Sequence, residues 1–590
     1  MKVPIILLSC SMALGSTAQV VNNISCTSAA AKQAMKGLHD PADYAAATVI
    51  DDHEVILCEM RWLLSPDSLH AYLAGMETFH TRNSYSDTVS SVAGIGAARR
   101  WAFSKFQQFS AANEDRLIPA YLQFDHPGGE CGDGPGWRNV LAVLPGSSTV
   151  DHQVIIIEAH FDSRCSDNCD PNCAAPGMED NGSGSALVME LARVMSRYTF
   201  KHTLIFMLTT AEEHGLVGAT AMAQYCVDEA IAIKGVLNND IVGGIICGET
   251  SSPPSCPGPG DVDSLQVRLF SNGSQSFPHR GFARTIKMFY QEKLEGEVNV
   301  PMTISVMNQE DRAGRGGDHI PFREKGYRNV RFTSANEHGD GSVDSSWYND
   351  HQHTSGDVLG VDTDGDMVID SFFVDFNYLQ RNALINGMSA ALLALGPEPP
   401  TFTVHDEPTG LRVEILNTDG LMEWRIGVRD APSSVDFEAL YRTNTTSFVI
   451  PNLTAPNAYF ISVAGIDSAT IMSPFTAELI KSNDAATPAG AMDNLPYGID
   501  CFGIGIAEQG PKPAQATLLP CQPNPFTGTT LFQVEMTGAT TVRNAYITIG
   551  DVHGREVARL PIALRTGMIP MEYAHRGPAG VFTYSLVIDG

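Results

Sequence analysis

Acidic and imidazole side chains recur in the middle of this chain, each just after a short apolar run or at the start of a predicted helix. The five places are His160-Phe161-Asp162, Glu179–Gly184, Glu212-Glu213, Asn239-Asp240 and His353–Asp357. Taken alone, each has an ordinary structural explanation, such as a helix cap or a solvated helix start. Together they offer the mixed imidazole and carboxylate ligands that favour zinc, although manganese or cobalt would also fit.

The surrounding residues predict an α/β domain. Apolar runs at 140–144, 154–157 and 204–208 are typical of strands covered on both faces, and a helix is predicted over 186–195. Strands that alternate with helices indicate a sheet flanked by helices, and such sheets gather ligands at the carboxyl ends of their strands. The polar positions should therefore meet at one edge of the sheet.

Carboxylates brought to one sheet edge would repel one another unless cations lay between them. Asp180, Glu212, Glu213 and Asp240 are the four acids concerned, and their pKa values would rise without such compensation. Two divalent ions, three ligating carboxylates, two imidazoles and one bridging hydroxide would balance the charge. The sequence thus predicts a two-ion centre.

The ordered series of motifs resembles the secreted two-zinc aminopeptidases of metallopeptidase family 28. The resemblance covers roughly residues 139–395 and rests on Ala159–Ser163, Ala175–Gly184, Ala211–Leu216, Asn239-Asp240, Gly317–Phe322 and His353–Asp357. It implies a zinc exopeptidase fold, with a mixed central sheet flanked by helices, and a hydrolase that acts on peptide substrates.

The resemblance also implies a set of metal ligands for two Zn²⁺ ions. Asp180 would bridge the ions, His160 and Asp240 would hold one of them, and Glu213 and His353 would hold the other. The peptide bond after Asp180 would be cis, as in the family.

Two further acids receive catalytic roles from the same resemblance. Glu212 would be the general base, because water bound to a metal has a pKa of about 7 and a nearby carboxylate can take its proton. Asp162 would orient the imidazole of His160 and raise its basicity. Asp318-His319 matches a motif that belongs to the wall of the cleft rather than to the ligands.

One ligand position has two candidates, because His351 and His353 are separated by a single residue. His353 is preferred, since it immediately precedes Thr354 and stands four residues before Asp357, as in the family's His-Thr-x-x-Asp pattern.

The direction of cleavage follows from the resemblance rather than from physics. An aminopeptidase is favoured by the Ala-Pro-Gly-x-x-Asp loop at 175–180. A carboxypeptidase on the same metal core is the alternative, with Arg312 and Arg315 holding the substrate carboxylate. A metal-free receptor or adhesin that keeps the fold is a third possibility, against which the intact ligand positions argue.

The composition and the N-terminus indicate an exported protein. Residues 1–18 read as a signal peptide, with a lipoprotein site at Cys10 as a minor alternative. No other segment is apolar enough to span a membrane. The net charge of −29 disfavours binding to nucleic acid.

The cysteines fit an oxidising compartment. Removal of the signal peptide leaves eleven cysteines, an odd number that requires a free thiol. Cys247 with Cys256 and Cys501 with Cys521 are the expected disulfides, and Cys165, Cys169 and Cys173 are expected to form loop disulfides rather than a zinc site.

The chain is expected to contain further modules around the catalytic domain. A helical N-terminal segment at 19–110, either a pro-segment or an outer layer, precedes the zinc peptidase domain at 111–397. Two small all-β sandwiches follow, at 398–480 and 515–590, separated by a linker at 481–514.

Each β module resembles a known domain. The first resembles a fibronectin type III domain, with Trp424, Leu453 and Tyr459 at core positions. The second resembles the sorting domain of proteins exported by the type IX secretion system, which implies secretion machinery as a partner, passage across an outer membrane, and a secreted or cell-surface location.

Overall fold

The computed structural model of the chain divides into two compact units, residues 1–501 and 502–590. In the first unit it describes residues 21–247, 261–273, 278–311, 316–334, 351–431 and 435–501; in the second it describes 515–522, 528–537, 544–551, 556–562, 567–576, 580 and 582–589. The predicted signal peptide and Arg312, Arg315 and Cys256 lie outside these ranges. No helix within them has both the length and the apolar character needed to cross a bilayer.

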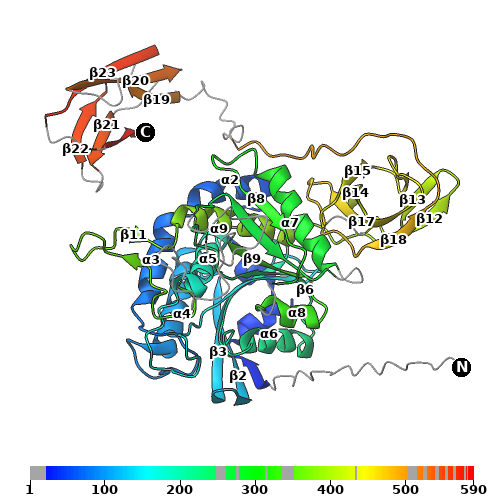
Figure 1. Cartoon of the computed structure of the whole chain (residues 1–590), viewed down its shortest axis with the longest axis horizontal. Coiled ribbons are helices and arrows are strands. Elements are labelled where there is room, and N and C mark those ends of the chain that lie inside the picture. Colours follow the sequence, from blue (N-terminus) through cyan, green and yellow to red (C-terminus); the bar gives the residue numbers. More distant parts are fainter. Residues whose placement is uncertain are drawn as a thin grey trace, which may run out of the picture. The chain divides into compact units, whose positions relative to one another are not determined.

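The larger unit is built on a nine-stranded mixed sheet with the order β1-β2-β3-β5-β4-β6-β9-β7-β8 (Figure 1). Strands β5, β4, β6 and β9 run parallel at its centre. The predicted strands at 140–144, 154–157 and 204–208 are confirmed. The strands are β1 (Asn22–Cys26), β2 (Ile118–Gly129), β3 (Gly132–Leu144), β4 (Val154–His160), β5 (Thr203–Thr209), β6 (Ile233–Asn239), β7 (Gln266–Phe270), β8 (Thr303–Val306) and β9 (Asn329–Ser334).

Helices cover both faces of this sheet (Figure 1). Because successive side chains of a strand point to opposite faces, Ile155 of β4 packs in the same core as Leu191 of α5, and Ile156 packs in a second core with Met222 of α6. Every residue of β4 is buried, as its unbroken apolar run predicts. The helices are α1 (Ala29–Met35), α2 (His53–Leu63), α3 (Pro66–Glu77), α4 (Gly94–Ala112), α5 (Gly184–Met195), α6 (Val217–Asp228), α7 (His279–Lys293), α8 (His319–Glu324) and α9 (Phe376–Leu395), with a 3₁₀ turn η1 (Pro41–Tyr44) and a π turn η2 (Met178–Ser183).

The N-terminal region belongs to the same body as the catalytic sheet. Helices α1 to α4 lie in the segment expected to be helical, but β1 also forms there and pairs antiparallel with β2, with Ser25 opposite Gln123. Helix α4 packs against α5. The segment thus contributes an edge strand and helices to the same body.

A second group of strands in the larger unit forms two sheets, of orders β12-β13-β16 and β15-β14-β17-β18. The two sheets share one core, in which Trp424, Leu453 and Tyr459 are buried as predicted. The strands are β12 (Phe402–Glu407), β13 (Gly410–Ile415), β14 (Leu421–Asp430), β15 (Ala439–Thr443), β16 (Ser447–Val449), β17 (Asn457–Asp467) and β18 (Leu479–Asn483); a short hairpin of β10 (Gly360–Val361) and β11 (Ser371–Phe372) precedes α9.

The prediction of a free linker is wrong for its first part, because residues 484–501 are fixed to the body of the unit. Asp493 accepts a hydrogen bond from Arg425 at 2.7 Å, and Arg425 also binds Glu292 of α7. At the end of this segment Cys501 forms a disulfide with Cys58 of α2. The expected Cys501–Cys521 disulfide is therefore wrong, and Cys521 is a free thiol. A composition rich in small residues predicted flexibility, but these long-range contacts override it.

The loop cysteines are paired as expected. Cys131 is bonded to Cys169, and Cys165 to Cys173. Cys247 is also disulfide-bonded, and Cys256, its predicted partner, lies outside the described ranges. Besides Cys521, the described free thiols are Cys26 and Cys226.

The second unit consists of two three-stranded sheets, of orders β19-β20-β23 and β22-β21-β24. Phe532, Ile547 and Tyr573 are buried in its small core. The predicted signature residues 523–526 and 552–555 lie outside the described ranges. Its strands are β19 (Gln515–Gln522), β20 (Thr529–Thr537), β21 (Asn544–Asp551), β22 (Glu556–Pro561), β23 (Gly567–Ala574) and β24 (Phe582–Asp589).

Candidate metal centre

The candidate ligands meet at the carboxyl edge of the central sheet. His160 is the last residue of β4, Glu213 follows β5, and Asp240 comes directly after β6. Because these strands are parallel neighbours, their ends lie side by side. Asp180 reaches the same place from η2, and His353 from the loop before α9. All five line one cavity of about 320 Å³.

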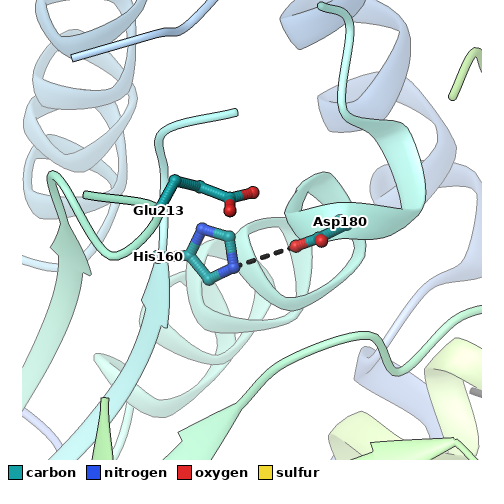
Figure 2. A group of neighbouring side chains, drawn as sticks. All are labelled: His160, Asp180 and Glu213. Carbon is teal, nitrogen blue, oxygen red and sulfur yellow. Dashed lines mark ion pairs between the residues drawn. The ribbon is translucent and has the colours of Figure 1, made fainter. Parts of the chain in front are cut away.

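Asp180 lies at the centre of the group. Its Oδ1 is 3.0 Å from Nε2 of His160, and its Oδ2 is 3.0 Å from Nε2 of His353. Nε2 of His160 is also 3.4 Å from Oδ1 of Asp240, and Nε2 of His353 is 3.3 Å from Oε2 of Glu213. Figure 2 shows the imidazole of His160 directed at Asp180, with the carboxylate of Glu213 beside it. The donors therefore form two sets that share one carboxylate.

The backbone around Asp180 is held by the loop that carries His353. The carboxylate of Asp357 accepts hydrogen bonds from the amides of Glu179, at 2.8 Å, and Asp180, at 3.0 Å. The Asp180-Asn181 peptide bond is cis, as the resemblance implied. Gly177 begins this turn with a φ of +57°, and a Cβ there would lie 2.4 Å from Cβ of Ser163. Only glycine fits this close approach.

The buried side chain of Arg82 joins two of the loops, a role that sequence reasoning missed. Its guanidinium donates to the backbone oxygens of Phe161, at 2.7 Å, and Gly177, at 2.8 Å. It thereby links the segment after His160 to the segment before Asp180. No local motif marks this arginine, because its partners are 79 and 95 residues away.

Asp162 contacts both His160 and the loop that carries the two glutamates. Nδ1 of His160 lies 3.1 Å from the backbone oxygen of Asp162 and 3.8 Å from its carboxylate. The carboxylate instead accepts the amides of Glu212, at 3.2 Å, and Glu213, at 3.3 Å. The backbone of Asp162 thus orients the imidazole, while its side chain positions the loop that carries the two glutamates. This position suits a carboxylate, because each of its two oxygens accepts a hydrogen bond from one of two neighbouring amides.

The other histidines and the aspartate that the sequence motifs singled out, His351, Asp318 and His319, have partners outside the group of candidate ligands. His351 packs on the ring of Phe373, with centroids 5.5 Å apart. Asp318 is buried and accepts a hydrogen bond from the hydroxyl of Thr209. Nε2 of His319 lies 3.2 Å from the backbone oxygen of Glu310. His353 is therefore the imidazole that faces Asp180.

The electrostatics of the group favour bound cations. Burial alone would lower the pKa of His160, but Asp180 and Asp240 raise it well above its usual value. Burial likewise opposes the charge of His353, yet Glu213 and Asp180 raise its pKa to about 10. The pKa of Asp180 is held well below its ordinary range, against burial, by the two imidazoles. Carboxylates buried this closely require positive charge, which divalent ions would supply.

Glu212 lines the cavity without joining an ion pair in the described part of the chain. Burial raises its pKa well above the ordinary value, His160 opposes that rise, and Glu213 and Asp240 add to it. A glutamate whose proton affinity is raised in this way suits general acid–base chemistry.

Two arginines brace the carboxylates of the two donor sets, and sequence reasoning missed both. Arg331 is buried and binds Asp240, at 3.1 Å, and Asp311, at 2.7 Å. Arg164 binds Glu213 through Nε, at 3.0 Å, and its NH2 group lies 2.7 Å from Nδ1 of His353. Each set thus has one arginine that holds its non-bridging carboxylate.

Gln352 is a further cavity residue that the sequence did not single out. It is 1% exposed, lines the cavity, and precedes His353. Its Oε1 atom accepts no hydrogen bond from the described residues. A buried acceptor without a donor is costly, and a polar group of a substrate would satisfy it.

The residues present fit metal ions. They supply two imidazole nitrogens and three carboxylates, and Oε1 of Glu213 is buried with no hydrogen-bond partner among the described residues. The donor atoms of His160, Asp180 and Glu213 lie within 4.8 Å of one another. The fold and the site thus define a mixed α/β protein with a metal centre at the carboxyl edge of its sheet.

Comparison with known proteins gives the family. Residues 139–252 match peptidase family M28. A probable zinc metalloprotease of Pyricularia oryzae is 30% identical over 402 residues, which cover 65% of this chain and 74% of that protein. A second, from Leptosphaeria maculans, is 29% identical over 393 residues, covering 65% and 85%. The chain belongs to peptidase family M28 and is a peptidase.

Solved structures also resemble the chain at lower identity. The LapA aminopeptidase of Legionella pneumophila covers 60% of this chain and 78% of its own, with 18% identity and a TM-score of 0.42. The glutaminyl cyclase of Porphyromonas gingivalis covers 55% and 98%, with 14% identity and a TM-score of 0.38.

Proposed function

We propose that the chain is a zinc aminopeptidase that holds two Zn²⁺ ions. The observation that carries this proposal is the position of Asp180, whose two carboxylate oxygens each lie 3.0 Å from a different imidazole. A carboxylate placed in this way can bridge two ions, one held by His160 and Asp240 and the other by Glu213 and His353. Zinc is favoured by the mixed nitrogen and oxygen donors and by relatives described as probable zinc metalloproteases.

The chain's own residues would manage the protons of the reaction. Bound zinc would polarise the scissile carbonyl and make a water molecule acidic enough to attack it. Glu212 faces the cavity beside the ligands and would take the proton of the attacking water. It would then return that proton to the departing amine. The carboxylate of Asp162 accepts a hydrogen bond from the backbone amide of Glu212 and so keeps Glu212 in place.

Cleavage from the N-terminus of the substrate is supported by the acceptors of the cavity. Oε1 of Gln352 is a buried acceptor with no donor among the described residues, and the α-amine of a substrate is a donor of the required kind. The alternative, a carboxypeptidase, needs an arginine that is open to a substrate carboxylate. Arg331 is already bound to two aspartates, which leaves that role to arginines outside the described ranges or to Arg164.

Three measurements test the proposal. Elemental analysis should find two zinc ions per chain, and a chelator should abolish release of single residues from short peptides. Acetylation of the substrate's N-terminus should block cleavage, whereas amidation of its C-terminus should not. The reverse pattern would establish a carboxypeptidase, and zinc-free protein without activity would indicate a receptor or adhesin.

The flanking modules support a proposal of export. Residues 1–18 would direct secretion, the two-sheet module at 398–480 would be a fibronectin type III-like spacer or binding domain, and residues 515–590 would be a type IX sorting domain that leads to a secreted or cell-surface location. Within the described residues, the two-sheet arrangement of β12 to β18 and that of β19 to β24 support this assignment. Tracking the protein in a host with and without residues 515–590 would test it.

A further inference from the structure

The guanidinium of Arg164 lies between two side chains that belong to different loops. Nε donates to Oε2 of Glu213, at 3.0 Å, and NH2 lies 2.7 Å from Nδ1 of His353. These partners are 49 and 189 residues away in sequence. Both of them form the donor set on one side of Asp180. Arg164 thus contacts the two non-bridging members of a single set and neither member of the other.

The segment that carries Arg164 is itself clamped. The disulfides Cys165–Cys173 and Cys131–Cys169 tie it internally and to the β2–β3 hairpin. Within it, Nδ2 of Asn168 donates to the backbone oxygen of Glu213, at 3.0 Å. The segment therefore holds Glu213 at two points, through its carboxylate and through its backbone.

The two arginines of the centre are not equivalent. Arg331 is 1% exposed and divides its charge between Asp240 and Asp311. The Arg164 side chain is 22% exposed, and Glu213 is the carboxylate it binds in the described part of the chain. The contact with Glu213 is the one that can persist with a bound metal ion, because Nδ1 of His353 carries the proton when Nε2 is a ligand, and a guanidinium has no acceptor.

We infer that Arg164 is a positioning residue that preorganises Glu213 for the zinc ion that Glu213 would share with His353, with the disulfide-clamped segment at 164–173 as its support. This inference rests on the proposed two-zinc function. Groups that orient metal ligands from outside the coordination sphere typically contribute about 10- to 100-fold in metal affinity. The positive charge of Arg164 would repel a bound cation, which opposes this gain in metal affinity. The carboxylate of Glu213 lies against the guanidinium and offsets that charge.

The test is a zinc titration of the full chain and of Arg164→Gln, read by calorimetry and by elemental analysis after dialysis. The wild-type chain should bind two ions. Arg164→Gln should bind one ion as the wild type does and the other about 10- to 100-fold more weakly. Arg164→Lys, which keeps the positive charge beside Glu213 but lacks the Nε–H donor, should fall between them. Circular dichroism should show that both variants are folded.

Arg412→Gln is a matched control, because Nε of Arg412 binds Glu407 at 2.6 Å in the same manner, within the β12–β13 hairpin. It should leave the zinc titration unchanged. Equal or tighter binding of both ions by Arg164→Gln would overturn the inference and leave the two-zinc function standing. A wild-type chain that binds fewer than two ions would overturn both.

The support from the segment has its own measurement. Replacing Cys165 and Cys173 by serine leaves Arg164 in the chain but releases its neighbours. The affinity for the same zinc ion should fall, but by less than in Arg164→Gln. A double variant that binds both ions as the wild type does would remove the disulfide from the inference.

Discussion

The carboxylate of Asp357 accepts the backbone amide of Asp180 at 3.0 Å, across 177 residues of sequence. It also accepts the amide of Glu179, at 2.8 Å. Asp357 therefore fixes the backbone of Asp180, the residue proposed to bridge the two ions. These two hydrogen bonds join the loop that contains His353 to the turn that contains Asp180.

Replacing Asp357 by Asn should weaken the hydrogen bonding between the loop and the turn. An amide has a single acceptor oxygen, so one of the two backbone amides would face a donor instead, at a cost of about 1 to 3 kcal/mol. We expect a lower melting temperature and a weaker hold on both ions, because Asp180 serves both sets. Zinc content after dialysis and thermal unfolding measure the two effects. Asp52→Asn is the control, since Asp52 accepts two amides at the start of α2 and Asn caps helices equally well; unchanged zinc content in Asp357→Asn would contradict the expectation.

Replacing Glu212 by Gln should separate catalysis from metal binding. The side chain keeps its size but can no longer accept a proton, so peptide hydrolysis should fall by at least about a hundredfold, the scale on which general-base loss acts. Zinc content should stay at the wild-type value, because Glu212 belongs to neither donor set. Loss of zinc together with activity would show instead that Glu212 is a ligand.

The candidate ligands could be predicted from the sequence because each stands in a recognisable local motif, and three of them follow strands of the sheet. Parallel strands then bring His160, Glu213 and Asp240 together without further information. The supports could not be predicted in this way. Arg82 and Arg164 stand in loops, and each acts on residues far along the chain, so no spacing marks them. Nor could the sequence predict that the backbone oxygen of Asp162 lies nearer His160 than its carboxylate does, while that carboxylate accepts the amides of Glu212 and Glu213.

The disulfide between Cys58 and Cys501 was missed for the same reason. The two cysteines are 443 residues apart, whereas the prediction paired Cys501 with a nearby cysteine. Composition also suggested a linker where Asp493 and Tyr497 are in fact held, by Arg425 and by the Oε1 atom of Glu292. Composition predicts the flexibility of an isolated segment, but it does not predict the tertiary contacts that the segment makes with a folded domain.

Removing this disulfide should release the segment at 484–501. We expect Cys58→Ser with Cys501→Ser to lower stability by about 2 to 4 kcal/mol and to expose the segment to proteases. Limited proteolysis with mass spectrometry of the fragments, together with thermal unfolding, measures both effects. Cys26→Ser changes a free thiol and should leave the cleavage pattern as it is. An unaltered pattern in the double variant would show that Asp493 and its neighbours hold the segment without the disulfide.

Protonation of His53 should destabilise the protein in mild acid. This histidine is buried at the start of α2, with Nε2 3.4 Å from Nζ of Lys293. Burial first, and then Lys293, lower its pKa from 6.5 to about 4, although Asp52 acts in the opposite direction. The unfolded chain therefore binds a proton more readily between these two values, so the stability contributed by neutral His53 is complete above pH 6.5 and is lost as the pH falls towards 4, by up to about 3 kcal/mol. The melting temperature of His53→Gln should depend less steeply on pH across this interval than that of the wild type, whereas parallel curves for the two proteins would show that His53 does not titrate in this way.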